Sequence, residues 1–210
     1  MYDFIVDLDA FFCEKYANYD KLCVLPEYRM PVMQATKTDD FGRTYGYTLP
    51  METMRLALQE KKADLLIALK KRMVDNTFSF SFTPVPFFSR VRNCFSKVTF
   101  LKLFKQILSK YNVAEENIFS GVDIAEEIQA GILKGVYYPT KNLILSLALT
   151  LQFSYEDTQA LLNYFGEDFD YTQVKDVVLA YLLQNRVYNS GMIDAALAEY
   201  KVGNLFFKNA

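Results

Sequence analysis

One stretch of this 210-residue chain, residues 141–152, is apolar on nearly every side and therefore constrains the fold most. Thr140 precedes it with a side chain typical of an N-cap, so the pattern predicts a helix over residues 141–152. A helix that is apolar all round needs neighbours on every side, which predicts the central helix of a globular unit. Its apolar run, Leu143 to Leu151, is shorter than the roughly 20 residues that cross a bilayer, so no membrane partner is expected.

The chain around this helix, from residue 99 to residue 210, has the three- and four-residue spacing of amphipathic helices. Further helices are predicted over residues 99–111, 114–120, 124–134, 154–166 and 172–185, and from Asn189 or Ser190 onward. In the helix over 124–134, Asp123 is the predicted N-cap, and Glu126 completes a capping box with it. The spacing thus predicts an all-helical domain of about six or seven helices over residues 99–210.

Residues 1–98 mix helical and extended patterns. Apolar spacing predicts helices over residues 2–17 and 51–74. Extended segments on either side of Gly42 predict a β-hairpin, and strict alternation over residues 77–83 predicts a half-buried strand able to pair with it. We therefore predict a mostly α protein. An α+β domain over residues 1–98 with a small antiparallel sheet precedes the all-α domain over residues 99–210.

The chain has no histidine, which excludes Ser-His, Cys-His and His-metal chemistries. Its three cysteines, Cys13, Cys23 and Cys94, have no CxxC spacing and are typical of reduced thiols in a cytoplasmic protein. Catalysis by carboxylate, Lys or Tyr side chains stays open in principle, but no constellation of such residues is recognisable. The sequence predicts no enzymatic activity, no cofactor and no metal site.

The charges of the chain are unevenly distributed. Residues 61–110 contain 11 Lys and Arg against 2 Asp and Glu, a net charge of +9, whereas residues 111–210 carry −7. Asymmetry of this size indicates charged partners. The residues suited to contact nucleic acid or another partner are Lys70, Lys71, Arg72, Arg90, Arg92, Lys97, Lys102, Lys105, Gln129 and Lys134.

Two of these assignments have structural alternatives. Lys70, Lys71 and Arg72 also complement the dipole at the C-terminal end of the helix predicted over residues 51–74. Phe78, Phe80 and Phe82 could stack on bases, but alternating Phe residues are more typical of a buried sheet face.

Several motifs after residue 98 carry a resemblance to a known family. They include Tyr138–Lys141 (YPTK), Phe153–Thr158 (FSYEDT), Val177 and Val178 with Leu182, and Ile193–Leu197 (IDAAL). With the order of the helices, they make the segment from Thr99 to about Phe206 resemble lambda-repressor-like (XRE-type) helix-turn-helix modules, more narrowly a helical module of bacterial Firmicutes proteins.

The resemblance implies that the helix over residues 124–134 corresponds to the one that enters the DNA major groove in DNA-binding members. Gln129 on that helix is suited to read adenine, and Lys134 to contact phosphate. The neighbouring outward residues Glu126 and Glu127 are acidic, and phosphates would repel them.

These observations support two hypotheses. The first is a non-enzymatic regulatory or protein-interaction protein on a diverged helix-turn-helix scaffold, with a protein as partner. The alternative is a transcriptional regulator or other nucleic-acid-binding protein that contacts phosphates through residues 61–110. Modules of this kind commonly dimerise, so a homo-oligomer is compatible with both, although no heptad seam supports it.

Overall fold

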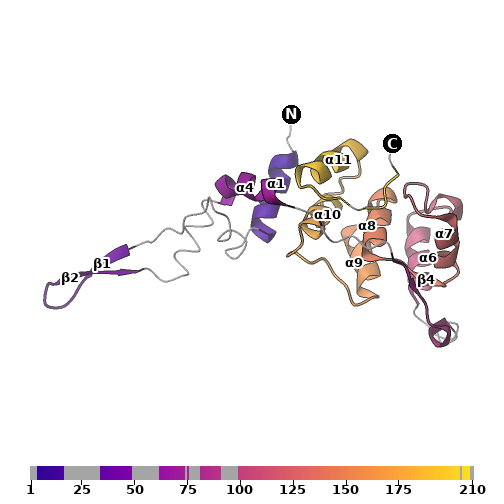
Figure 1. The fold of residues 1–210 in the computed structure, drawn as a ribbon, viewed down its shortest axis with the longest axis horizontal. Coiled ribbons are helices and arrows are strands. Elements are labelled where there is room, and N and C mark those ends of the chain that lie inside the picture. The colour runs from indigo at the N-terminus through magenta and orange to yellow at the C-terminus, as the bar shows by residue number, and fades with distance from the viewer. Residues whose placement is uncertain are drawn as a thin grey trace. The chain divides into compact units, whose positions relative to one another are not determined.

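The computed structural model describes residues 4–16, 34–48, 62–73, 75, 81–90, 99–203 and 205–208 (Figure 1). The described chain is mostly helical with small antiparallel sheets, as the sequence predicts. It divides into two compact units, Met1–Met73 and Val74–Ala210, each of which is described by itself below.

The first unit contains a helix pair and a hairpin. Helix α1 (Phe4–Lys15) packs against α4 (Lys62–Arg72), with Leu8 and Phe12 of α1 fully buried. Strands β1 (Gln34–Thr38) and β2 (Thr44–Thr48) form an antiparallel hairpin, in which Gly42 adopts a φ of 78°. The antiparallel pairing of these strands confirms the predicted hairpin, and a glycine takes up the positive φ of its turn without the strain that a Cβ causes.

The second unit is built around two buried helices, α8 (Lys141–Thr150) and α10 (Val174–Gln184). Every residue from Asn142 to Leu149 is buried, which confirms the predicted central helix. Each fully buried Leu contributes about 1.5–3 kcal/mol to folding. Further helices of this unit are α6 (Phe100–Lys110), α7 (Glu126–Leu133), α9 (Tyr155–Asn163) and α11 (Ser190–Glu199), with a short 3₁₀ turn, η1 (Glu115–Asn117).

Side-chain caps fix the beginnings of several helices. The side chains of Thr140, Ser154 and Asn189 each accept a hydrogen bond from the backbone N–H three residues on, at 3.2 Å. This confirms the N-cap predicted at Thr140 and the predicted beginnings of α9 and α11. The capping box predicted for α7 is wrong, because that helix begins at Glu126 with Ala125 as its N-cap and no side-chain cap. Asp123 instead donates its backbone N–H to the Phe206 carbonyl at 2.6 Å, so the backbone there is paired with the C-terminal segment.

A short two-stranded sheet places residues 81–90 in the second unit. Strand β3 (Thr83–Pro84) pairs with β4 (Tyr137–Tyr138), and the Val85 N–H donates to the Val136 carbonyl at 2.7 Å. The extended residues at the end of the predicted strand 77–83 therefore pair with β4 rather than with the hairpin, and residues 77–80 lie outside the described residues. The division of the chain after Met73 likewise falls before the predicted boundary near residue 98.

A polar network ties α6 to α9. The Asp157 carboxylate accepts hydrogen bonds from Lys110 Nζ at 2.7 Å and from Tyr111 Oη at 2.6 Å, and Tyr111 Oη in turn accepts one from the Ser154 N–H. Burial by itself would raise the pKa of Asp157, but these donors outweigh it and hold the pKa below its ordinary value. The network thus anchors the C-terminal end of α6 to the helical core.

Candidate functional site

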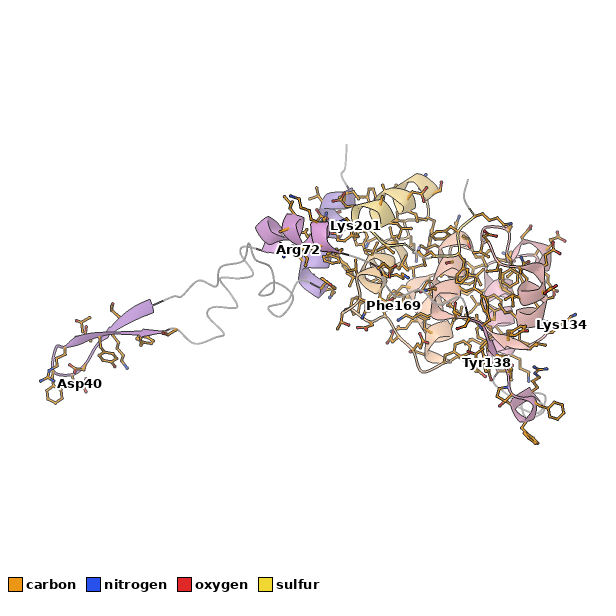
Figure 2. All side chains as sticks on the ribbon, viewed as in Figure 1. Asp40, Arg72, Lys134, Tyr138, Phe169 and Lys201 are labelled. Atoms are coloured by element: carbon orange, nitrogen blue, oxygen red, sulfur yellow. The ribbon has the colours of Figure 1, made fainter. Side chains whose placement is uncertain are left out.

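Four cationic side chains surround one pocket of about 380 Å³ in the second unit. Arg90 comes from the turn after β3, Lys102 and Lys105 come from α6, and Lys134 follows α7. Tyr137 and Tyr138 of β4 also line the pocket. Figure 2 labels Lys134 and Tyr138 on this part of the unit.

The sheet and a helical turn hold Arg90 in place. Residues 87–90 are helical, and the Arg90 N–H donates to the Pro86 carbonyl at 3.0 Å. The Arg90 guanidinium donates from Nε to the Val85 carbonyl at 2.9 Å, and Val85 is buried. Because the backbone of Val85 is itself bonded to Val136, the arginine is attached to the same sheet that carries the two tyrosines.

Lys102 and Lys105 share a face of α6, because side chains three residues apart on a helix are neighbours. Both are exposed. Lys102 lies in the first turn, whose backbone N–H groups carry the positive end of the helix dipole. A cation there opposes the dipole, so an anion bound at this end of α6 would be stabilised both by the lysine and by the helix.

Two glycines allow α7 and β4 to come close to one another and to α6. Gly135 follows Lys134 with a φ of 69°, and a Cβ at this position would lie 3.0 Å from Leu101 Cδ1 of α6. A Cβ on Gly131 would lie only 2.4 Å from the Tyr137 ring. The glycines therefore let Lys134 and Tyr137 reach the pocket from a tight turn after α7.

The pocket has a charge of one sign, because its described lining contains four cations and neither Asp nor Glu. Lys105 and Lys134 have no carboxylate within ion-pair distance among the residues that the structure places. Such a site attracts anions, and arginine and lysine donate charge-assisted hydrogen bonds to phosphate or carboxylate oxygens.

Four of the ten residues singled out in the sequence thus meet at one pocket: Arg90, Lys102, Lys105 and Lys134. Lys70, Lys71 and Arg72 belong to the first unit, in the last turn of α4, where Lys70 forms an ion pair with Asp9 at 2.6 Å. Arg92 and Lys97 lie outside the described residues.

In α7, the helix expected to read DNA, the side chain of Gln129 is bonded within the protein. The Gln129 side-chain amide donates from Nε2 to the Ile124 carbonyl at 2.8 Å, which uses the group that would read adenine. Glu126 and Glu127 are both exposed in the first turn of α7. The surface of α7 is therefore acidic at its start and contributes to the basic pocket only at its end.

The sequence patterns did not predict one feature of the segment that carries Arg90, the two exposed rings of Phe87 and Phe88. They are 71% and 86% exposed and contact one another edge to face, with ring centroids 6.0 Å apart. Successive residues on a helical turn point about 100° apart, so two adjacent Phe residues rarely both reach the core. The adjacency of the two Phe residues in the sequence therefore indicates that at least one ring is exposed.

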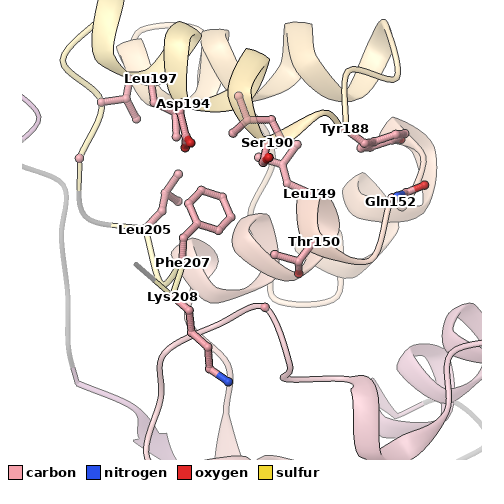
Figure 3. Close-up of a pocket in the computed structure, with 14 residues that line it drawn as sticks. Leu149, Thr150, Gln152, Tyr188, Ser190, Asp194, Leu197, Leu205, Phe207 and Lys208 are labelled. Atoms are coloured by element: carbon pink, nitrogen blue, oxygen red, sulfur yellow. The ribbon is translucent and has the colours of Figure 1, made fainter. Parts of the chain in front are cut away.

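A second pocket, of about 710 Å³, lies between the end of α8, α11 and the C-terminal segment 205–208 (Figure 3). Its charged lining residues are Asp194 and Lys208, one of each sign, and much of the remainder is apolar, as at Leu149 and Phe207. Since opposite charges offer no preference for an anion, the basic pocket is the stronger candidate for a charged ligand.

The described residues show no group of three or more Cys, Asp or Glu side chains arranged to hold a metal ion. None of the helices in the described ranges is long and apolar enough to cross a membrane. Comparison of the chain with protein-family models, curated proteins and solved structures found no match. The resemblance to XRE-type modules therefore stays a prediction from the sequence motifs.

Proposed function

We propose that this protein is a non-enzymatic binding protein with a regulatory role, and that its second unit holds an anionic group of its partner in the basic pocket. The observation that carries the proposal is the convergence of Arg90, Lys102, Lys105 and Lys134 from three separate segments. Like charges brought together repel one another. An anionic group bound among these cations would be attracted by each of them and would lower that repulsion.

The pocket is suited to a phosphate or carboxylate group rather than to a bulky apolar ligand. Its volume of about 380 Å³ is at the small end for ligand sites. Its cations lie on or next to helices and a strand. Hydrogen bonds between charged groups each contribute about 1.5–3 kcal/mol when they are made. Arg90 adds directional recognition, because its guanidinium presents a planar set of donors.

A second candidate is a protein contact through α7 on a diverged helix-turn-helix scaffold. It is favoured by the exposed Glu126 and Glu127, since adjacent carboxylates suit a basic protein surface better than a DNA groove. This candidate uses the start of α7, whereas the basic pocket uses its end. Charge reversal at Glu127 therefore tests it separately.

The basic pocket is tested with inorganic pyrophosphate as the probe, followed by amide NMR chemical shifts of the full chain. We expect concentration-dependent shifts at Leu101, Lys102 and Gly135, and their loss in Lys105→Glu. Lys208→Glu is the matched control, because Lys208 is an exposed lysine of the same unit outside this pocket. Shifts scattered over the surface, or equal in both variants, would overturn the proposal.

A further inference from the structure

The exposed rings of Phe87 and Phe88 belong to the same helical turn as Arg90 of the basic pocket. Phe87 and Arg90 are three residues apart in the same helical turn, which the bond from the Arg90 N–H to the Pro86 carbonyl closes. Residues at this spacing are neighbours on a helix surface, with Cβ atoms about 5–6 Å apart. Two exposed aromatic rings and one cation of the pocket, Arg90, therefore lie on one short segment.

Covering two adjacent exposed aromatic rings with an apolar or aromatic surface of a partner is favourable, because it removes apolar area from water. A small inorganic anion would satisfy the cations but would leave both rings exposed. A partner that engages both features brings negative charge and flat apolar faces together.

We infer that this partner is a single-stranded nucleic acid, an inference that rests on the proposed anion-binding function. A phosphate of the strand occupies the pocket lined by Arg90, Lys102, Lys105 and Lys134, and a base of a neighbouring nucleotide stacks on Phe87 or Phe88. Single strands bind proteins through this combination of a basic groove and aromatic platforms.

A duplex does not fit the aromatic part of the surface, because its base faces are already stacked inside the helix. An acidic peptide would match the cations but brings flat aromatic faces only where its sequence supplies them. Nucleotides supply one charge and one flat face each, so a short strand matches both the cations and the rings.

The test is fluorescence anisotropy of the full chain with a labelled oligothymidylate of about 12 nucleotides, within the usual size of such sites. We expect binding that weakens with salt, and preference over a duplex of equal length. The double substitution Phe87→Ala/Phe88→Ala should weaken binding roughly 5- to 100-fold, as expected for the loss of one stacked base. Lys208→Glu, away from the pocket, should change it far less.

The controls separate this inference from the proposed function. The phenylalanine variant should keep the pyrophosphate shifts, since both rings are exposed and their removal leaves the pocket intact. Unchanged oligonucleotide affinity in that variant, equal binding of the duplex, or equal binding of a polyglutamate peptide would each overturn the inference. Pyrophosphate shifts that persist in that case would leave the proposed function standing. If the wild-type chain showed neither oligonucleotide binding nor pyrophosphate shifts, both the inference and the proposed function would be overturned.

Discussion

The second unit uses its cations in two contrasting ways. Lys175 is 2% exposed and forms an ion pair with Asp75 at 3.0 Å, while Lys141 pairs with Asp176 and Lys110 with Asp157. These lysines each face a carboxylate, and they connect α10, α8 and α6 to other parts of the unit. Around the basic pocket, by contrast, four cations line a cavity whose described lining has no carboxylate.

The difference separates cations that pair with a carboxylate of the fold from cations that line a pocket whose described lining has none. A buried charge costs several kcal/mol unless a partner and further hydrogen bonds compensate it, so Lys175 is retained because Asp75 pairs with it and Asn142 accepts a hydrogen bond from it. Exposed lysines cost little to solvate, so Lys105 and Lys134 need no fold partner to be tolerated. Substitution should therefore destabilise the fold in the first set and leave its stability nearly unchanged in the second.

The largest expected effect comes from the paired set. Lys175→Met leaves the Asp75 carboxylate buried opposite an apolar side chain, and should lower the free energy of unfolding by about 3–5 kcal/mol. Urea denaturation followed by circular dichroism measures it. The matched double substitution Lys175→Met/Asp75→Leu should recover much of the loss, because it removes both buried charges. If Lys175→Met were as stable as the wild type, the distinction between the two sets of cations would be wrong.

A smaller effect is expected at the partly exposed pair of Lys110 and Asp157. The pKa of Asp157 is held below its ordinary value of about 4 in the folded state, where donors outweigh burial. Its stabilisation is therefore complete above that ordinary value and is lost as the pH falls through the depressed folded pKa. Asp157→Asn should cost about 1–3 kcal/mol near neutral pH, since it removes charged hydrogen bonds.

The pH dependence provides the check on that assignment. The difference in unfolding free energy between the wild type and Asp157→Asn should shrink as the pH falls below about 4. Urea midpoints at a series of pH values measure it. Glu199, an exposed carboxylate outside the network, supplies the control substitution Glu199→Gln. A difference that stays constant with pH would show that the Asp157→Asn substitution acts through packing instead.

Local sequence signals predicted the parts of the fold that depend on nearby residues. The caps at Thr140, Ser154 and Asn189 act within three residues, and the hairpin needs only Gly42 between two extended segments. The burial of α8 follows from its own composition. In each case the pattern and the structure that it causes lie in the same short stretch.

Pairings between distant residues could not be predicted in this way. Asp123 is a good N-cap residue, but a bridge from Val122 to Phe207 fixes its backbone from a point more than 80 residues further along the chain. Strands β3 and β4 have only two residues each, too few to produce a periodic signal. The pairing of residues 122 and 123 with the C-terminal segment, rather than the N-cap preference of Asp123, therefore determines where α7 begins.

The basic pocket could be predicted only in part, because its residues also come from distant parts of the chain. The basic block of residues 61–110 supplies three of the four pocket cations, but the chain divides within it, so Lys70, Lys71 and Arg72 belong to one unit and Arg90, Lys102 and Lys105 to the other. Lys134 joins the second group only because Gly131 and Gly135 let the chain turn back after α7. The number of charged residues could be counted from the sequence, whereas the meeting of these four cations at one pocket could be seen only in the fold.

The smallest expected effect on stability, and the sharpest contrast with Lys175, comes from the pocket itself. The double substitution Lys105→Gln/Lys134→Gln removes two like charges from an exposed cluster, so the free energy of unfolding should change by less than about 0.5 kcal/mol. The same variant should lose most of its pyrophosphate shifts. Urea denaturation and the NMR titration measure the two properties on one sample, with Lys208→Gln as the control. Destabilisation as large as that of Lys175→Met would mean that the pocket lysines hold the fold together, and the separation of the two sets would fail.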